Sequence, residues 1–184
     1  MKYSYLTSII KQFEYYKSLG DKTIDTLNFD ELQKEFTKDS NTIAIIVKHM
    51  VGNMLSRWTN FLTEDGEKTW RHRDLEFEGT YTTKEELFEN WNTGWQCLFK
   101  AIKSLQETDL ERIIYIRNQG HTATEAINRQ LAHYSYHVGQ MVFLGKLIKG
   151  ENWQSLSIPK GDSSKYNDGK FSKEKERRHF TDDL

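Results

Sequence analysis

The segment Gln130-Leu-Ala-His-Tyr-Ser-Tyr-His-Val-Gly-Gln140 decides how this chain folds. Its two histidines, His133 and His137, stand four residues apart within a stretch whose apolar residues recur at helical spacing. At about 100° per residue this spacing places both imidazoles on one face of a helix, roughly 6 Å apart along its axis. Two imidazoles arranged in this way can bind one divalent metal ion. The segment therefore predicts a long helix that carries two ligands of a metal site.

A third candidate ligand, His49, lies in a second helical segment. Its apolar stripe consists of Ile43, Val47, Met50, Met54, Trp58 and Phe61. The run Thr42–Val47 is rich in β-branched residues and alone would suit a buried strand, but the helical period that continues beyond it favours a helix. Ser40 and Asn41 are residue types that commonly begin helices. If this helix contacts the His133 helix, three imidazoles converge inside the protein.

Two further segments complete a predicted four-helix bundle. The first has helical periodicity over residues 6–27, and the second begins at Thr83-Lys-Glu-Glu86, which has the spacing of a capping box. Thr122-Ala-Thr-Glu125 is a second capping box, at the start of the His133 helix. Before it, the apolar run Ile113–Ile116 predicts an extended segment that Asn118–Gly120 turns back. Four amphipathic helices with modest connections are typical of an all-α four-helix bundle.

The end of the chain has a different composition from the bundle. Gly150 is placed to end the last long helix, and helical periodicity is lost after it. We therefore expect residues 1–150 to form the bundle and residues 151–184 a C-terminal extension. Further along, the extension is rich in glycine, serine and charged residues, which predicts a mobile, poorly structured tail. Its start is expected to pack on the bundle through Trp153, Leu156 and Ile158.

The composition excludes several classes of protein. A formal net charge of −1 gives no long-range attraction to phosphate backbones, so we expect no nucleic-acid partner. No apolar run approaches the ~20 residues needed to span a bilayer, and no secretory signal is recognisable. The single cysteine, Cys97, cannot form an intramolecular disulfide, which fits a reducing compartment. The sequence predicts a cytoplasmic protein with no membrane partner.

The histidines have two interpretations. A single inward histidine is more often a hydrogen-bonded core residue than a ligand. Three of them on two helices, with no carboxylates spaced for charge pairing beside them, favour a metal site. Three histidine ligands leave a tetrahedral ion one open position, as in catalytic zinc sites, whereas a structural ion more often has four protein ligands. Gln140 is a candidate for that fourth ligand.

Several polar residues are candidate accessory groups. Arg57 lies two helical turns from His49, where its guanidinium could meet a carboxylate or phosphate of a substrate, and a salt bridge at the helix end is the equal alternative. Asn53 could orient His49 or a water at the metal, but a satisfied polar group inside the bundle is the stronger alternative. Arg71 and Arg73 could form an anion-binding lip, although loop arginines are more often solvated.

The blocks that carry the histidines, Asn41–Asn53 and His133–Gln140, resemble the DinB-like (YfiT-like) metalloprotein superfamily, and more narrowly an uncharacterised branch of it. Supporting blocks are Ser56–Lys68, Trp70–Asp74 and Ser155–Gly161. The resemblance covers roughly the first 160 residues. It implies a four-helix bundle with the connectivity of that superfamily. It also implies a zinc, nickel or other divalent ion, with His49 matching the first ligand of the family and His133 and His137 the paired ligands.

The resemblance also implies classes of activity. Characterised relatives in the superfamily include transferases that join a low-molecular-weight thiol such as bacillithiol to an electrophile, and a mycothiol-dependent maleylpyruvate isomerase. Homodimers are common among them. The expectation is a metal-dependent enzyme that acts on a small molecule, either a thiol S-transferase or a hydrolase, with the metal keeping a thiol deprotonated. Because a shared fold does not transmit function, the alternative is a non-catalytic metal-binding protein associated with stress or with protein interactions.

Overall fold

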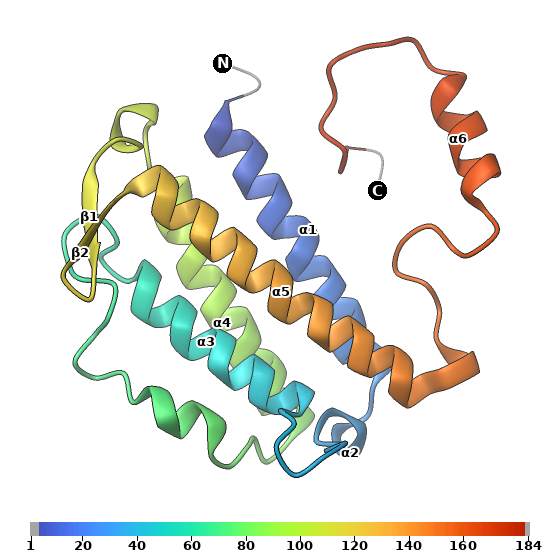
Figure 1. Cartoon of the computed structure of the whole chain (residues 1–184), viewed down its shortest axis with the longest axis horizontal. Helices are drawn as coiled ribbons and strands as arrows, with labels where there is room; N and C mark the ends of the chain where they lie inside the picture. The colour runs from blue at the N-terminus through green and yellow to red at the C-terminus, as the bar shows by residue number, and fades with distance from the viewer. Residues whose placement is uncertain (1–3, 183–184) are drawn as a thin grey trace.

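Four long helices form the body of the protein, in a computed structural model that describes residues 4–182 (Figure 1). They are α1 (Tyr5–Thr26), α3 (Ile43–Trp58), α4 (Lys84–Lys103) and α5 (Ala123–Lys149). The prediction of an all-α four-helix bundle is confirmed. The short elements are α2 (Phe29–Leu32), η1 (Arg73–Phe77), η2 (Glu107–Asp109), β1 (Ile113–Ile116), β2 (Gln119–Thr122), η3 (Gly150–Asn152) and α6 (Ser163–Phe171).

The beginnings of the helices follow side-chain hydrogen bonds. Thr122 and Glu125 form the predicted capping box of α5. The predicted start of α3 is wrong by one or two residues, since Thr42 caps the helix by accepting a hydrogen bond from the Ile45 N–H group. Ser40 cannot serve there because its hydroxyl already accepts hydrogen bonds from two backbone N–H groups of the preceding turn. Local chemistry therefore sets both helix starts, but neighbouring turns compete for the capping side chains.

The extended segment before α5 is a two-stranded hairpin. β1 and β2 pair antiparallel, with Ile116 opposite Gln119. The two residues of the turn, Arg117 and Asn118, have φ of 55° and 60°, which is the left-handed conformation that a type I′ turn requires. The predicted extended run is confirmed, and the turn begins one residue earlier than expected. The hairpin brings Arg117 close to the loop that follows α3, where it pairs with Glu67.

An aromatic cluster fills the centre of the bundle. Phe13 of α1 contacts the rings of Trp58, Trp95 and Tyr134, with ring centroids between 6.0 and 6.3 Å apart. All four side chains are fully buried or nearly so. Because they come from α1, α3, α4 and α5, they join every long helix into one core. None of the helices in the described part of the chain is long and apolar enough to cross a lipid bilayer.

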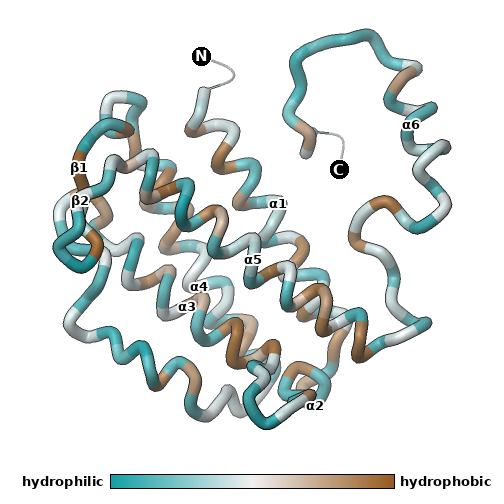
Figure 2. The backbone as a smooth tube through the Cα atoms, viewed as in Figure 1, coloured by the Kyte–Doolittle hydropathy of each residue, from teal (hydrophilic) through white to brown (hydrophobic). Residues whose placement is uncertain are grey.

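The C-terminal extension leaves the end of α5 and returns toward α1 (Figure 1). Trp153 lies against Gly145 of α5, where an added Cβ atom would be 2.9 Å from its ring. Ile158 is 42% exposed, so the expected anchoring through this residue is not seen. The extension contains one helix that the sequence did not predict, α6, and the stretch after it is mainly hydrophilic (Figure 2). Phe180 then packs against Tyr15 of α1.

Candidate metal centre

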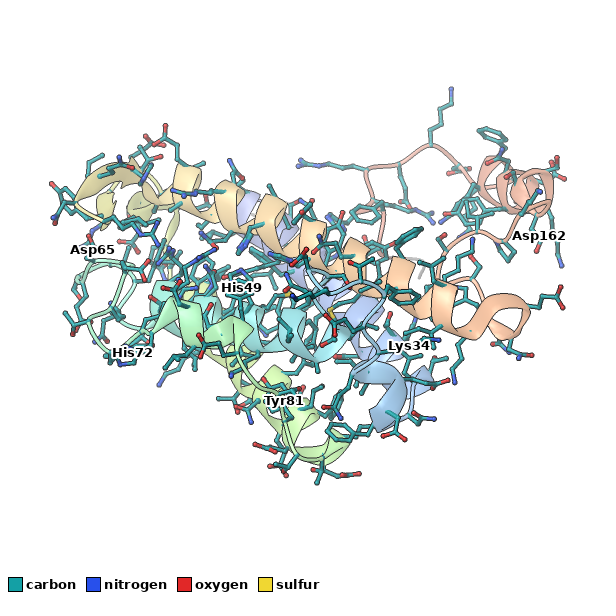
Figure 3. All side chains as sticks on the ribbon, turned by 60° about the horizontal axis from the view of Figure 1, so that its bottom comes forward. Lys34, His49, Asp65, His72, Tyr81 and Asp162 are labelled. Carbon is teal, nitrogen blue, oxygen red and sulfur yellow. The ribbon has the colours of Figure 1, made fainter. Side chains whose placement is uncertain are left out.

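The three predicted histidines converge between α3 and α5. These two helices lie side by side and run in opposite directions (Figure 1), and His49 lies where they approach each other (Figure 3). The Nε2 atom of His133 lies 3.4 Å from Nε2 of His49 and 3.1 Å from Nε2 of His137. One possible ligand atom from each histidine lies within 4.8 Å of the other two. Within residues 4–182 this is the only group of three histidine, cysteine or acidic side chains so placed. The cluster could hold a metal ion.

Two of the rings are held from behind by oxygen atoms. Nδ1 of His49 lies 2.8 Å from a carboxylate oxygen of Glu76, and Nδ1 of His137 lies 2.8 Å from the amide oxygen of Gln140. A carboxylate oxygen only accepts, so this contact selects the tautomer of the neutral His49 ring that has its proton on Nδ1 and a lone pair on Nε2. The same holds for His137 with its amide partner. Both lone pairs therefore face the Nε2 atom of His133.

The residues fit a divalent metal ion. A proton on His133 Nε2 could be shared with one neighbouring lone pair, and the other lone pair would then have no positive partner. A cation among the three nitrogens would satisfy all of them at once. Tetrahedral zinc with ordinary zinc–nitrogen bonds separates its ligand nitrogens by about 3.3 Å. The observed separations of 3.1 and 3.4 Å lie close to that value.

The surroundings keep the imidazoles of α5 neutral. Burial lowers the pKa of His133 to about 3, with further lowering by His137, His49 and the more distant Arg57 and Arg71. Burial also lowers the pKa of His137, against the opposing hydrogen bond with Gln140. Metal ligands have to be deprotonated, so protons do not compete for these two nitrogens at neutral pH.

Glu76 is a residue of the candidate centre that the sequence analysis missed. It lies in η1, 27 residues after His49, and is buried. Arg71 donates to both of its carboxylate oxygens, at 2.7 and 3.0 Å. Burial alone would raise the pKa of Glu76, but the hydrogen bonds from His49 and Arg71 and the charge of Arg71 bring it below its ordinary value. The expectation that no carboxylate pairs with the histidines is therefore wrong, because the loop after α3 folds back onto that helix.

The structure places Arg57 in a salt bridge at the end of α3, which is the second of its two expected roles. Its guanidinium donates to the carbonyl oxygen of Gly66 and lies 3.1 and 3.2 Å from a carboxylate oxygen of Glu67. The side chain is buried at the end of α3 and ties that helix to the following loop. Its two terminal nitrogens are therefore engaged in the salt bridge and loop contact rather than directed to a substrate at the histidines.

Asn53 has the role that the sequence analysis favoured for it, and Gln140 is not positioned as a fourth ligand. The Asn53 amide oxygen accepts a hydrogen bond from the Tyr134 hydroxyl, which itself accepts one from the Trp58 indole, so Asn53 is a satisfied polar group of the core. Glu76, not Asn53, orients His49. Gln140 supports His137 from behind instead of supplying a fourth ligand.

The two loop arginines do not form a lip over the centre. The Arg71 side chain is only 2% exposed and is paired with Glu76. Arg73 is exposed, and its guanidinium lies 5.2 Å from the centre of the Phe77 ring. One arginine is thus part of the support of the centre, and the other covers a ring on the surface.

The chain belongs to the family described as "Protein of unknown function (DUF1572)", whose model matches residues 1–162. The match includes the four long helices, the hairpin and all three histidines, and it ends just before α6. No curated protein and no solved structure matches the chain. The family description carries no activity, so the function has to be inferred from the geometry of the centre.

Proposed function

We propose that this protein binds one divalent metal ion through the Nε2 atoms of His49, His133 and His137. The observation that carries the proposal is the convergence of three imidazole nitrogens, two of which have their other nitrogen bonded outward to an oxygen. Zinc and nickel are among the ions that suit such a nitrogen donor set. The family resemblance to the DinB-like superfamily points to the same ion and the same three ligands.

The arrangement supports a catalytic rather than a structural ion. The described residues offer three clustered ligands, and the amide oxygen of the nearby Gln140 is occupied by His137. His49 is buried, whereas His133 and His137 are partly exposed, so the centre is accessible from the α5 side. A divalent ion bound there would supply Lewis acidity, which favours the deprotonated form of a water or a thiol. The chain's own part is to hold the three imidazole nitrogens in place.

We propose a small molecule as the substrate and thiol S-transfer or hydrolysis as the reaction. This part rests on the DinB-like resemblance, with a low-molecular-weight thiol as the possible second cofactor and a homodimer as the expected assembly. The alternative is a non-catalytic metal-binding protein. The accessible side of the centre favours the enzyme, because a purely structural ion needs no access for a ligand.

Elemental analysis tests the metal site. The protein is purified without a nickel column, since histidine sites take up nickel from such columns, and wild type is compared with His133→Ala and His72→Ala. His72 is an exposed histidine outside the cluster and serves as the control. We expect about one ion per chain in wild type and His72→Ala, and none in His133→Ala. A wild-type protein that binds no zinc even when zinc is added would overturn the proposal.

Cobalt substitution tests the catalytic part. Addition of a low-molecular-weight thiol to the cobalt-loaded protein should produce a sulfur-to-cobalt charge-transfer band, because the open position accepts a thiolate. A spectrum that no thiol or small anion changes would indicate a closed coordination sphere and favour the non-catalytic alternative. In an activity screen of thiols with electrophiles, His137→Ala should be inactive while its helical content, measured by circular dichroism, is retained.

A further inference from the structure

We infer that Glu76 is a positioning residue of the metal centre, and that Gly52 of α3 makes the room in which it acts. Glu76 holds the His49 ring so that Nε2 faces the other two histidines, and the segment that carries Glu76 supplies none of the three proposed ligands. The inference rests on the proposed metal binding and extends the centre from three residues to the loop that follows α3.

The contact between Glu76 and His49 is short and shielded from solvent. The Glu76 carboxylate lies 2.8 Å from Nδ1 of His49, and the two residues are 7% and 6% exposed. The neighbouring Phe77 ring lies over the His49 ring, with centroids 5.0 Å apart. The imidazole is thus fixed by a hydrogen bond at one edge and by an aromatic ring on one face. Little rotation of the ring remains possible.

Arg71 fixes Glu76 in turn. The guanidinium donates through Nε to one carboxylate oxygen and through Nη2 to the other, at 2.7 and 3.0 Å. Such paired hydrogen bonds define both the position and the plane of a carboxylate. The charge of Arg71 also compensates the burial of the Glu76 charge, which would otherwise be unfavourable. Glu76 therefore remains an acceptor for the N–H group of His49.

Gly52 allows the carboxylate to lie directly on α3. A Cβ atom at this position would be 2.3 Å from the Glu76 Oε1 atom and 2.7 Å from its Cδ atom. These distances are much shorter than any ordinary contact, so every other residue at position 52 would displace the Glu76 carboxylate. A glycine within a helix is less favourable than an alanine at the same position. Its presence one turn after His49 is explained by the space that Glu76 occupies.

The two supported ligands differ in the charge of their partners. His49 has an anionic carboxylate behind it, whereas His137 has the neutral amide of Gln140. A carboxylate partner makes an imidazole a stronger donor to a metal than an amide partner does, and loss of such outer partners typically weakens metal binding about 10–100-fold. The effect of Glu76 on metal affinity should therefore exceed that of Gln140.

Zinc affinity measured by competition with a chromogenic chelator tests the inference in the full-length protein. The test variants are Glu76→Gln and Gly52→Ala. A glutamine at position 76 retains the size of the side chain but must direct its NH₂ group at either Arg71 or the Nδ1–H group of His49, where donor meets donor. The controls are Glu78→Gln, an exposed residue two positions on, and Gly139→Ala, a helical glycine of α5 whose added Cβ would contact nothing.

We expect both test variants to bind zinc about 10–100-fold more weakly than wild type, and both controls to stay within about twofold. A Glu76→Gln affinity within about twofold of wild type would overturn the inference. So would an equal loss in all four variants, which would indicate general destabilisation. If Gly52→Ala does not fold, Glu76→Gln alone decides.

The tautomer of His49 in the metal-free protein provides a second measurement that a merely structural role would not change. Nitrogen-15 NMR of the imidazoles should show the proton on Nδ1 in wild type and a loss of that preference in Glu76→Gln. An unchanged His49 tautomer would overturn the positioning role. Because this measurement needs no metal, it separates the two proposals: a wild type that binds no zinc refutes the proposed function, while the tautomer still decides the role of Glu76.

Discussion

The aromatic core and the histidine centre are neighbours that share α3 and α5, yet their polar groups are arranged in different ways. In the core, the Trp58 indole donates to the Tyr134 hydroxyl, which donates to Asn53, so the polar groups satisfy one another. One residue away on α5, His133 faces two further imidazoles whose lone pairs point toward it. These three polar groups of the core are paired within the chain, whereas the three imidazole nitrogens form a cluster that could hold a metal ion.

This difference is the reason for placing the proposed function at the histidine centre. Buried polar groups in proteins are normally paired, and exceptions call for an explanation such as an ion. The two regions should therefore respond differently to change. Alterations of the core should lower the stability of the metal-free protein with little effect on metal affinity. Alterations of the centre should lower metal affinity with little effect on the stability of the metal-free protein.

The largest expected effect is in the core. Phe13→Ala removes a fully buried ring that contacts residues of three other helices. We expect the free energy of unfolding of the metal-free protein to fall by about 3–5 kcal/mol in chemical denaturation. The zinc affinity of the folded fraction should remain close to that of wild type. A loss of affinity comparable to that of His133→Ala would show that core and centre are one energetic unit.

Metal removal is the corresponding test of the centre. An ion that binds only the folded protein at a hundredfold excess over its dissociation constant stabilises it by about 2.7 kcal/mol. Chelation of zinc should therefore lower the melting temperature of wild type, and also that of Phe13→Ala by a similar free energy. His133→Ala should not respond to zinc or to the chelator. A wild-type melting temperature that is independent of zinc would contradict the proposal that the histidine centre binds a stabilising ion.

A smaller effect is expected where the two regions meet. Tyr134→Phe removes the hydroxyl that links Trp58 to Asn53 and leaves both groups without that partner. Because unsatisfied buried groups are costly, stability should fall by about 1–3 kcal/mol, again with little change in zinc affinity. Tyr136→Phe is the control, since Tyr136 is 62% exposed. Equal effects of the two substitutions in thermal unfolding would argue against a closed polar chain in the core.

The smallest expected effect concerns the anchor of the loop that carries Glu76. Asp65 accepts hydrogen bonds from the backbone N–H groups of Glu67, Arg117 and Asn118. Burial raises its pKa, but these hydrogen bonds outweigh burial and bring the pKa below its ordinary value. A carboxyl group whose pKa is lowered by folding stabilises the protein above its unfolded pKa of about 3.9, and this stabilisation is lost as the pH falls through the folded pKa.

Asp65→Asn should therefore be less stable than wild type at pH 7, by less than about 1 kcal/mol because the site is partly exposed to solvent. The difference should decrease as the pH is lowered below about 4. Denaturant unfolding over a pH series measures it, with Asp74→Asn as the control, since the Asp74 side chain is 96% exposed. A difference between wild type and Asp65→Asn that is independent of pH would show that the charge of Asp65 is not the cause.

The sequence predicted the parts of the molecule that depend on short-range spacing. The four helices, the extended run at Ile113–Ile116 and the capping box at Thr122 follow from residues at most a few positions apart. The same is true of the His133–His137 pair. His49 was identified by its place on a helical face, and its meeting with the other two histidines was a prediction from the bundle, which the structure confirms.

The environment of these histidines could not be predicted in the same way. Glu76 lies in a loop with no regular period, so its return to α3 left no pattern in the sequence, and Arg71 appeared to be an ordinary loop arginine. The sequence left two possible roles each for Arg57 and Asn53, and only their neighbours in space decide between them. Arg57 contacts Gly66 and Glu67, and Asn53 accepts a hydrogen bond from Tyr134.

The sequence by itself determined that the chain forms a helical bundle and that two of its helices present three histidines. Helical periodicity is a local property, because backbone hydrogen bonds join residues four apart and side chains repeat every 3.6 residues. Only the tertiary structure decided which lone pairs face one another and which carboxylate orients His49. Hydrogen bonds and ion pairs act over about 3 Å between atoms whose separation along the chain is arbitrary, so they exist only once the loops are in place.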